Sequence, residues 1–173
     1  AHDFGRSTAF FASKTRLQIC DRSYNTANGA LDLQGADNGR DKIDFSILSD
    51  LSYTNVVNSL VSNLNSIVPT NYSFIHITEP DTAGHSSGWA SASYSNAVRG
   101  VDVQIGRILD AINANPVLAN NTALIISADH GGSGSSHTTA SLLTNYTIPF
   151  FLISPGTPPG ADLRRESGTG GGP

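Results

Sequence analysis

Four short apolar runs along the chain have the pattern of buried β-strands. They cover residues 8–12, 73–78, 123–128 and 148–154, and each is continuous rather than alternating in polarity. A continuous apolar run is typical of a strand that is covered on both faces, as in a parallel sheet. The pattern therefore predicts four buried strands in such a sheet.

Two stretches between these runs repeat apolar residues at the spacing of an amphipathic helix. One starts near Leu51 and ends at Pro69, which cannot continue a helix, and the other extends from Ser91 to about Asn113. Strands that alternate with helices in this order are joined by crossover connections. The predicted fold is a doubly wound α/β domain, with a mostly parallel sheet and helices on both faces.

Length and composition limit the organisation to one domain. The chain has 173 residues, of which 38% are hydrophobic, and this is enough for one sizeable core. We expect the domain to cover residues 1–160, because residues 161–173 are glycine-rich, poor in apolar side chains and typical of a flexible or artificial tail. The single Cys20 cannot form an intrachain disulfide.

The charge distribution argues against nucleic acid and membrane partners. The net charge is −4, and the ten Lys and Arg residues are scattered without a basic run. No segment reaches the roughly 18 apolar residues of a membrane span, and no signal peptide is visible. Because the chain lacks methionine and begins at Ala1 just before a strand, we expect its natural start to be missing.

Candidate metal ligands follow two of the predicted strands. Asp81 and His85 come after the second apolar run, and Asp129 and His130 come directly after the third. His137 lies seven residues further on, behind a flexible segment of glycine and serine. In open α/β sheets the carboxyl ends of the strands form the ligand-binding edge. Five carboxylate and imidazole ligands suit a zinc-like ion and are too many for one catalytic zinc, so two metals are expected.

Residues 84–88, GHSSG, also match the serine-hydrolase pattern G-x-S-x-G. The alternative is an α/β-hydrolase-like serine esterase, in which Ser86, Asp129 and His137 follow the expected chain order. Two features weigh against it. A nucleophile elbow lies in the sharp turn between a strand and a helix, whereas residues 80–83 intervene here and the next predicted helix starts only later. Asp129 and His137 also share one loop, while the acid and base of a triad usually occupy separate loops.

Other polar residues near the predicted strands receive structural interpretations. His76 lies inside the second apolar run, so it is predicted to be a hydrogen-bonded histidine of the core. Glu79 is interpreted either as a partner that orients Asp81 or as an exposed residue at the strand end. Lys14 follows the first run and has no assigned role.

The motif Asp81-x-x-x-His85, the later Asp129-His130-Gly131 and then His137 ahead of the last apolar run resemble the C-terminal half of the catalytic domain of the alkaline phosphatase superfamily. The similarity extends from about residue 8 to 156 and is greatest to the bacterial branch described as alkaline phosphatase-like, type I phosphodiesterase or nucleotide pyrophosphatase, with sulfatases as distant kin. The resemblance implies that Asp81, His85 and His137 bind one metal and that Asp129 and His130 bind a second. Zinc is the expected metal, with manganese, magnesium and calcium as alternatives.

The resemblance also implies an activity, and it indicates which parts of the family's active site this chain lacks. It predicts a metal-dependent hydrolase of small-molecule phosphate esters that is periplasmic or secreted. The family's N-terminal strand with a further metal-binding Asp, and its Thr or Ser nucleophile, have no counterpart here, so both are expected outside this chain. The chain alone is then expected to be incomplete and inactive. A sulfatase of the same superfamily and a metal-binding fragment without turnover are the remaining alternatives, and substrate subclass and oligomeric state stay open.

Overall fold

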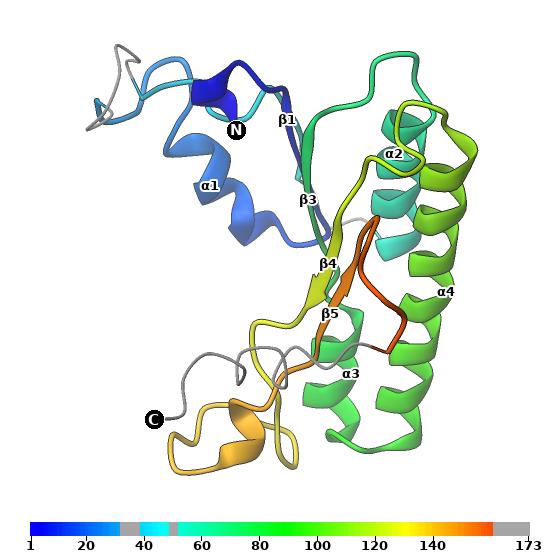
Figure 1. The fold of residues 1–173 in the computed structure, drawn as a ribbon. Coiled ribbons are helices and arrows are strands. Elements are labelled where there is room, and N and C mark those ends of the chain that lie inside the picture. Colours follow the sequence, from blue (N-terminus) through cyan, green and yellow to red (C-terminus); the bar gives the residue numbers. More distant parts are fainter. Residues whose placement is uncertain (32–38, 49–51, 161–173) are drawn as a thin grey trace, which may run out of the picture.

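A computed structural model describes residues 1–31, 39–48 and 52–160 (Figure 1). In chain order the elements are the 3-10 helix η1 (His2–Phe4), strand β1 (Thr8–Ala12), 3-10 helix η2 (Thr15–Leu17), helix α1 (Gln18–Arg22), strand β2 (Phe45–Leu48), helix α2 (Tyr53–Leu64), strand β3 (Tyr72–His76), helices α3 (Glu79–Ser87) and α4 (Ala92–Ala114), strand β4 (Leu124–Ser127), 3-10 helix η3 (Leu143–Asn145) and strand β5 (Phe150–Ile153). The tail predicted for residues 161–173 lies outside the described residues.

Three strands form a parallel sheet in the order β2, β1, β3. Phe10 of the central strand pairs with Ser46 on one side and with Phe74 on the other. Helices α2 and α4 pack together on one face of this sheet, and the short α1 lies on the opposite side (Figure 1). The predicted α/β class, a parallel sheet flanked by helices, is confirmed.

The hydrophobic core lies between the sheet and the two long helices. Helix α2 packs against β1 and β3, α4 packs against α2, and the apolar faces of both helices contribute to the core, as their helical spacing predicts. The buried cluster contains Ala9, Phe11, Val56, Val57, Leu60, Leu64, Ile108, Ala111 and Ile112. Helix α4 begins after Ser91, whose hydroxyl accepts the N–H of Tyr94, a normal N-cap contact. This packing fixes β1 and β3, whose carboxyl ends face the candidate site.

The last two strands differ from the sequence-based prediction. β4 and β5 form a separate antiparallel pair, with Ile125 opposite Leu152, instead of joining the parallel sheet. Their side chains are also less buried than predicted, since Ile125 is 61% and Phe151 57% exposed. A parallel connection needs a crossover of a dozen or more residues, usually a helix. The segment between β4 and β5 contains only the 3-10 helix η3, and it returns the chain antiparallel to β4.

Strand β2 and helix α3 are among the elements that were not predicted. β2 is a four-residue edge strand behind a charged stretch, too short to show a clear apolar run. Helix α3 is built largely from small and polar residues, so its apolar periodicity is weak. It starts at Glu79, which overturns the expectation that the helix after the second apolar run starts only near Ser91. Ser86 therefore lies in the last turn of a helix and not in a turn between strand and helix, so it still does not have the position of a nucleophile elbow.

None of the helices within the described ranges combines the length and apolar character that a membrane crossing requires.

Candidate metal centre

Helix α3 positions the first two candidate ligands. It follows β3 after two residues, with Pro80 in its first turn, where the missing N–H costs nothing. Asp81 and His85 are one turn apart and face the same side, so that His85 Nε2 lies 3.3 Å from Asp81 Oδ1. Asp81 also lies in the first turn, where the helix dipole favours a carboxylate.

The loop after β4 brings the remaining candidate ligands to the same place. The ring of His130 stacks on that of His137, with centroids 3.7 Å apart and planes 14° from parallel. His137 in turn lies 5.1 Å from the ring of His85, and His130 Nε2 lies 3.7 Å from Asp81 Oδ1. Side chains from two separate segments thus meet around the Asp81 carboxylate.

Backbone carbonyls fix which nitrogen of two imidazole rings carries the proton. His85 Nδ1 is 3.0 Å from the carbonyl oxygen of Ser135, and His130 Nδ1 is 2.8 Å from that of Gly131. A carbonyl only accepts, so both Nδ1 atoms donate, and the Nε2 of each neutral ring keeps a lone pair. Metal-ligating histidines in proteins have this arrangement, with the other ring nitrogen donating to a carbonyl or carboxylate.

With both rings neutral, three atoms that carry lone pairs therefore face one another, and none of them has a hydrogen to donate to the others. The Nε2 atoms of His85 and His130 both face Asp81 Oδ1, which is buried and has no hydrogen-bond partner among the described residues. A buried carboxylate oxygen without a partner is costly, and facing lone pairs repel each other. Cations bound at these atoms would satisfy all three, so the residues fit metal ions.

One subset has the spacing that a single ion needs. Asp81, His85 and His137 each offer a ligand atom, and these atoms all lie within 4.8 Å of one another. A tetrahedral zinc with bonds of about 2.1 Å holds its ligand atoms roughly 3.4 Å apart, so the ligand atoms would move closer by at most about 1.4 Å around an ion.

Asp129 is less enclosed than the other four candidate residues. Its side chain is 75% exposed, and its Oδ2 lies 3.7 Å from His130 Nε2. The other oxygen, Oδ1, accepts the backbone N–H of His130 at 3.1 Å. Asp129 and His130 therefore stand at the rim of the Asp81 group, with His130 between the two carboxylates.

Comparison with known proteins identifies the family. The model of the type I phosphodiesterase/nucleotide pyrophosphatase family matches residues 3–147, which is most of the chain. The chain belongs to this family. The resemblance seen in its motifs is thereby confirmed, together with the superfamily that the motifs indicated.

Two curated relatives match parts of this phosphodiesterase-family chain. Ectonucleotide pyrophosphatase/phosphodiesterase family member 3 of Mus musculus is 35% identical over 80 residues, which are 45% of this chain and 9% of that protein. Venom phosphodiesterase of Naja atra is 30% identical over 89 residues, which are 50% of this chain and 11% of that protein. The matched segments thus span about a tenth of the length of these relatives.

A solved structure has a similar fold. Murine ectonucleotide pyrophosphatase/phosphodiesterase 5, determined as an inactive variant in complex with AMP, aligns with a TM-score of 0.50 at 21% identity. The alignment covers 75% of this chain and 30% of that chain. At this identity the likeness supports the shared fold.

Sequence reasoning missed one charged residue of this phosphodiesterase-family site. Lys14 lies two residues beyond β1, and its Nζ is 3.7 Å from Asp81 Oδ2. The signal was its place after a strand end, since β1 and β3 are parallel neighbours and their carboxyl ends meet. Lys14 supplies a positive charge beside the carboxylate in a chain whose net charge is negative.

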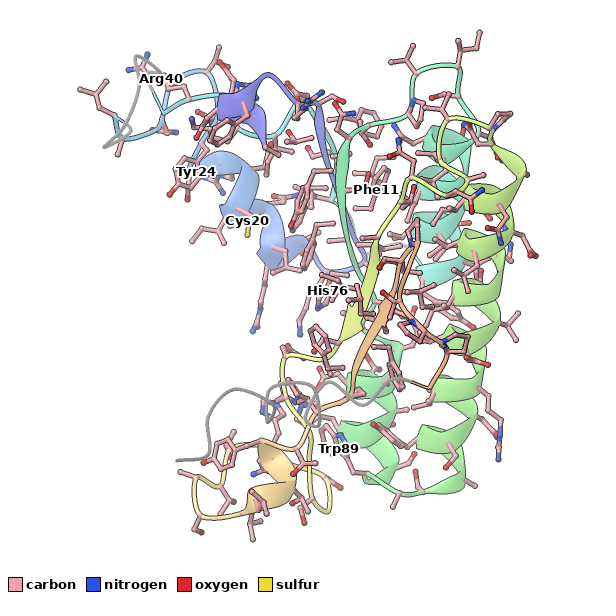
Figure 2. The ribbon with its side chains drawn as sticks, in the orientation of Figure 1. Phe11, Cys20, Tyr24, Arg40, His76 and Trp89 are labelled. Atoms are coloured by element: carbon pink, nitrogen blue, oxygen red, sulfur yellow. The ribbon has the colours of Figure 1, made fainter. Side chains whose placement is uncertain are left out.

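Two other residues differ from their sequence-based interpretations. His76, at the end of β3, is half-buried, and its Nδ1 has no partner among the described residues, so the predicted hydrogen bond is absent there (Figure 2). Burial lowers the pKa of His76 below its ordinary value, while the carboxylate of Asp129 acts in the opposite direction. Glu79 accepts the backbone N–H of Tyr53 at 2.8 Å, so it is bonded to α2.

Proposed function

We propose that this chain forms the metal-binding part of a metal-dependent phosphoric ester hydrolase, of the phosphomonoesterase or the phosphodiesterase/nucleotide pyrophosphatase type. Asp81, His85 and His137 would hold one divalent ion, and Asp129 and His130 would contribute to a second. Zinc suits this set of carboxylate and imidazole donors best. The observation that carries the proposal is the convergence of two imidazole Nε2 atoms on the unpartnered oxygen of Asp81.

The chain's own residues would prepare the site for a phosphate ester. Two metal ions, when bound, would supply the positive charge that stabilises a phosphoryl group during transfer. The carbonyls of Ser135 and Gly131 keep the Nε2 lone pairs of His85 and His130 available, because each accepts the Nδ1 proton. The Lys14 ammonium, 3.7 Å from Asp81, would add attraction for an anionic substrate at the same edge.

The nucleophile is proposed to come from outside these residues. In the family a Thr or Ser at the start of a helix attacks phosphorus, and none of the motifs of this chain matches that position. The Ser86 hydroxyl, the alternative nucleophile, donates to the carbonyl of Ala83 at 3.2 Å within its own helix. No hydrogen bond joins Ser86 to a histidine among the described residues. This supports the external nucleophile over the serine esterase.

The relatives' names support a substrate class and a location. The matching family acts on nucleotide pyrophosphates or phosphodiesters by its description, and the structural neighbour was solved with AMP. We propose a small nucleotide-like phosphate ester as substrate. The relatives are named as an ectoenzyme and a venom enzyme, so we also propose that this protein acts outside the cell.

Calorimetric titration with AMP tests the proposal on the 173-residue chain. We expect AMP to bind the zinc-loaded chain, to lose binding after chelation with EDTA, and to bind at least tenfold more weakly to Asp81→Asn. His2→Ala is the matched control, because it removes a histidine far from the site in the sequence. AMP binding that persists unchanged after chelation would contradict the proposal.

The same preparations also test the source of the nucleophile. Bis(p-nitrophenyl) phosphate should not be hydrolysed above background by the chain alone, because the nucleophile is proposed to be absent. Turnover that survives chelation, together with labelling of Ser86 by a fluorophosphonate, would favour the serine esterase instead. If the unmodified chain hydrolyses the diester and Asp129→Ala does not, the result would support the metal site and refute the proposal that the nucleophile lies outside this chain.

A further inference from the structure

Trp89, the only tryptophan of the chain, contacts both segments that carry the candidate ligands. It follows α3 and lies next to Gly84 of that helix and Gly132 of the loop after β4 (Figure 2). A Cβ built on Gly84 would lie 2.7 Å from ring atoms Cδ2 and Cε2, and one built on Gly132 would lie 2.2 Å from the same atoms. Carbon atoms in contact prefer about 3.5–4.0 Å. Both positions therefore require glycine while Trp89 stays where it is.

The indole also borders three of the candidate ligands. Its ring centroid is 5.1 Å from that of His85, 6.0 Å from His137 and 6.3 Å from His130. The ring planes of Trp89 and His85 are 82° apart, an edge-to-face arrangement of the kind that aromatic pairs favour. One side chain thus touches ligands from both segments.

The backbone of Trp89 adds a second link between the segments. Its N–H donates to the carbonyl of Gly134 at 2.7 Å, and the preceding Gly88 has a φ of 91°, a conformation that favours glycine. The loop itself contains Gly132-Ser133-Gly134-Ser135-Ser136, which has no apolar side chain to pack. The loop forms its own hydrogen bonds between Ser133 and Ser136, and Trp89 links it to α3 through two further contacts.

We propose that Trp89 is a positioning residue that sets the distance between the α3 ligands and the loop ligands. This inference rests on the proposed metal site. Trp89 contacts both α3 and the loop after β4, so it helps to hold Asp81 and His85 opposite His137. A site whose ligands are already placed loses less conformational freedom on binding and therefore binds more tightly. Residues that orient metal ligands typically contribute about 10- to 100-fold to metal affinity.

Zinc affinity of Trp89→Phe and Gly132→Ala, measured by calorimetry on the 173-residue chain, tests the inference. Trp89→Phe keeps an aromatic ring but leaves the space of the second ring empty. Gly132→Ala keeps Trp89 and all ligands but pushes the loop away from the indole. We expect both variants to bind zinc about 10- to 100-fold more weakly than the unmodified chain, with circular dichroism spectra like its own.

Gly106→Ala is the matched control, because a Cβ at this position of α4 meets nothing within 4 Å. It should bind zinc as the unmodified chain does. If Gly132→Ala and Trp89→Phe fold and bind zinc with unchanged affinity, Trp89 has only a packing role and the inference is wrong. If the unmodified chain itself binds no zinc, the proposed metal site fails and this inference fails with it. Zinc binding by the unmodified chain together with unchanged affinity in both variants would overturn this inference alone.

Trp89 fluorescence gives an independent readout. Because the indole lies beside His85, zinc binding at the proposed site should change its emission, and cobalt(II) should quench it strongly. Gly132→Ala retains the only tryptophan, so the same titration should show the weakened affinity directly. Stoichiometric metal binding without any change in emission would place the metal elsewhere and contradict the inference.

Discussion

His76 is the histidine near the site whose protonation is governed by burial. Its pKa is lowered from the ordinary value of 6.5, mainly because burial penalises the charged ring. The unfolded chain therefore takes up this proton near pH 6.5, whereas the folded chain takes it up only at lower pH. Between the two values the unfolded state binds more protons, so this residue makes the folded state less stable as the pH falls through 6.5.

The His76→Gln variant tests this sign. In urea unfolding at pH 7.5 and pH 5.5 with chelator present, the unmodified chain should lose more stability on acidification than His76→Gln does. The difference between the two proteins isolates the contribution of residue 76 from those of the other histidines. An equal loss in both proteins would show that burial of His76 does not control its protonation.

Residue types and their places after predicted strands indicated which side chains lie close together at the candidate site. Asp81 and His85 have the i, i+4 spacing of one helix face. Asp129 and His130 follow β4, which pairs with β5 outside the parallel sheet, so the geometry of that sheet does not by itself explain their place beside Asp81. The role of Trp89 was not predictable, because it depends on contacts between glycines that are far apart in the sequence. Such contacts have no local pattern.

Among the elements, α2 and α3 are joined at their first turns by Glu79. The N-cap residue of α2, Ser52, makes no side-chain capping bond, and Glu79 Oε1 accepts the N–H of Tyr53 in its place. Glu79 itself stands in the first turn of α3, so one carboxylate serves the N-terminal ends of two helices. The link connects the core helix to the helix that carries Asp81 and His85.

The Glu79→Ala variant should lower the free energy of unfolding by about 1–2 kcal/mol, the usual effect of losing an N-terminal cap. Glu79→Gln keeps an acceptor oxygen and should lose less. Asp102→Ala, an exposed carboxylate on α4, is the control and should stay within about 0.5 kcal/mol of the unmodified chain. Urea unfolding measures all three, and a loss no larger in Glu79→Ala than in the control would refute the link.

Element prediction succeeded where the apolar period was strong. The helix expected from Ser91 to about Asn113 is α4, and the earlier amphipathic stretch contains α2, which ends at Leu64 before Pro69. Prediction failed for α3 and for the pairing of β4 with β5. The small polar residues of α3 give no apolar stripe, and a continuous apolar run does not reveal the direction of its partner strand.

At the scale of the whole molecule, the candidate site lies where the helix after β3 meets the loop after β4. The chain shares its fold with a phosphodiesterase-family structure over 75% of its length, but that alignment covers only 30% of the other protein. Several large apolar side chains of β4 and β5 are exposed, among them Phe150 and Phe151. The ligands of the proposed first metal all lie within the described residues. The nucleophile, in contrast, is proposed to lie outside this chain. Metal binding is therefore the property on which this chain can be tested by itself.

Metal content by elemental analysis tests the central claim most directly. The 173-residue chain should retain stoichiometric zinc after dialysis, while His85→Ala and His130→Ala should each lose most of it, because each removes an Nε2 that faces Asp81. His2→Ala should keep the zinc of the unmodified chain. Stoichiometric metal that neither His85→Ala nor His130→Ala reduces would contradict the proposed site.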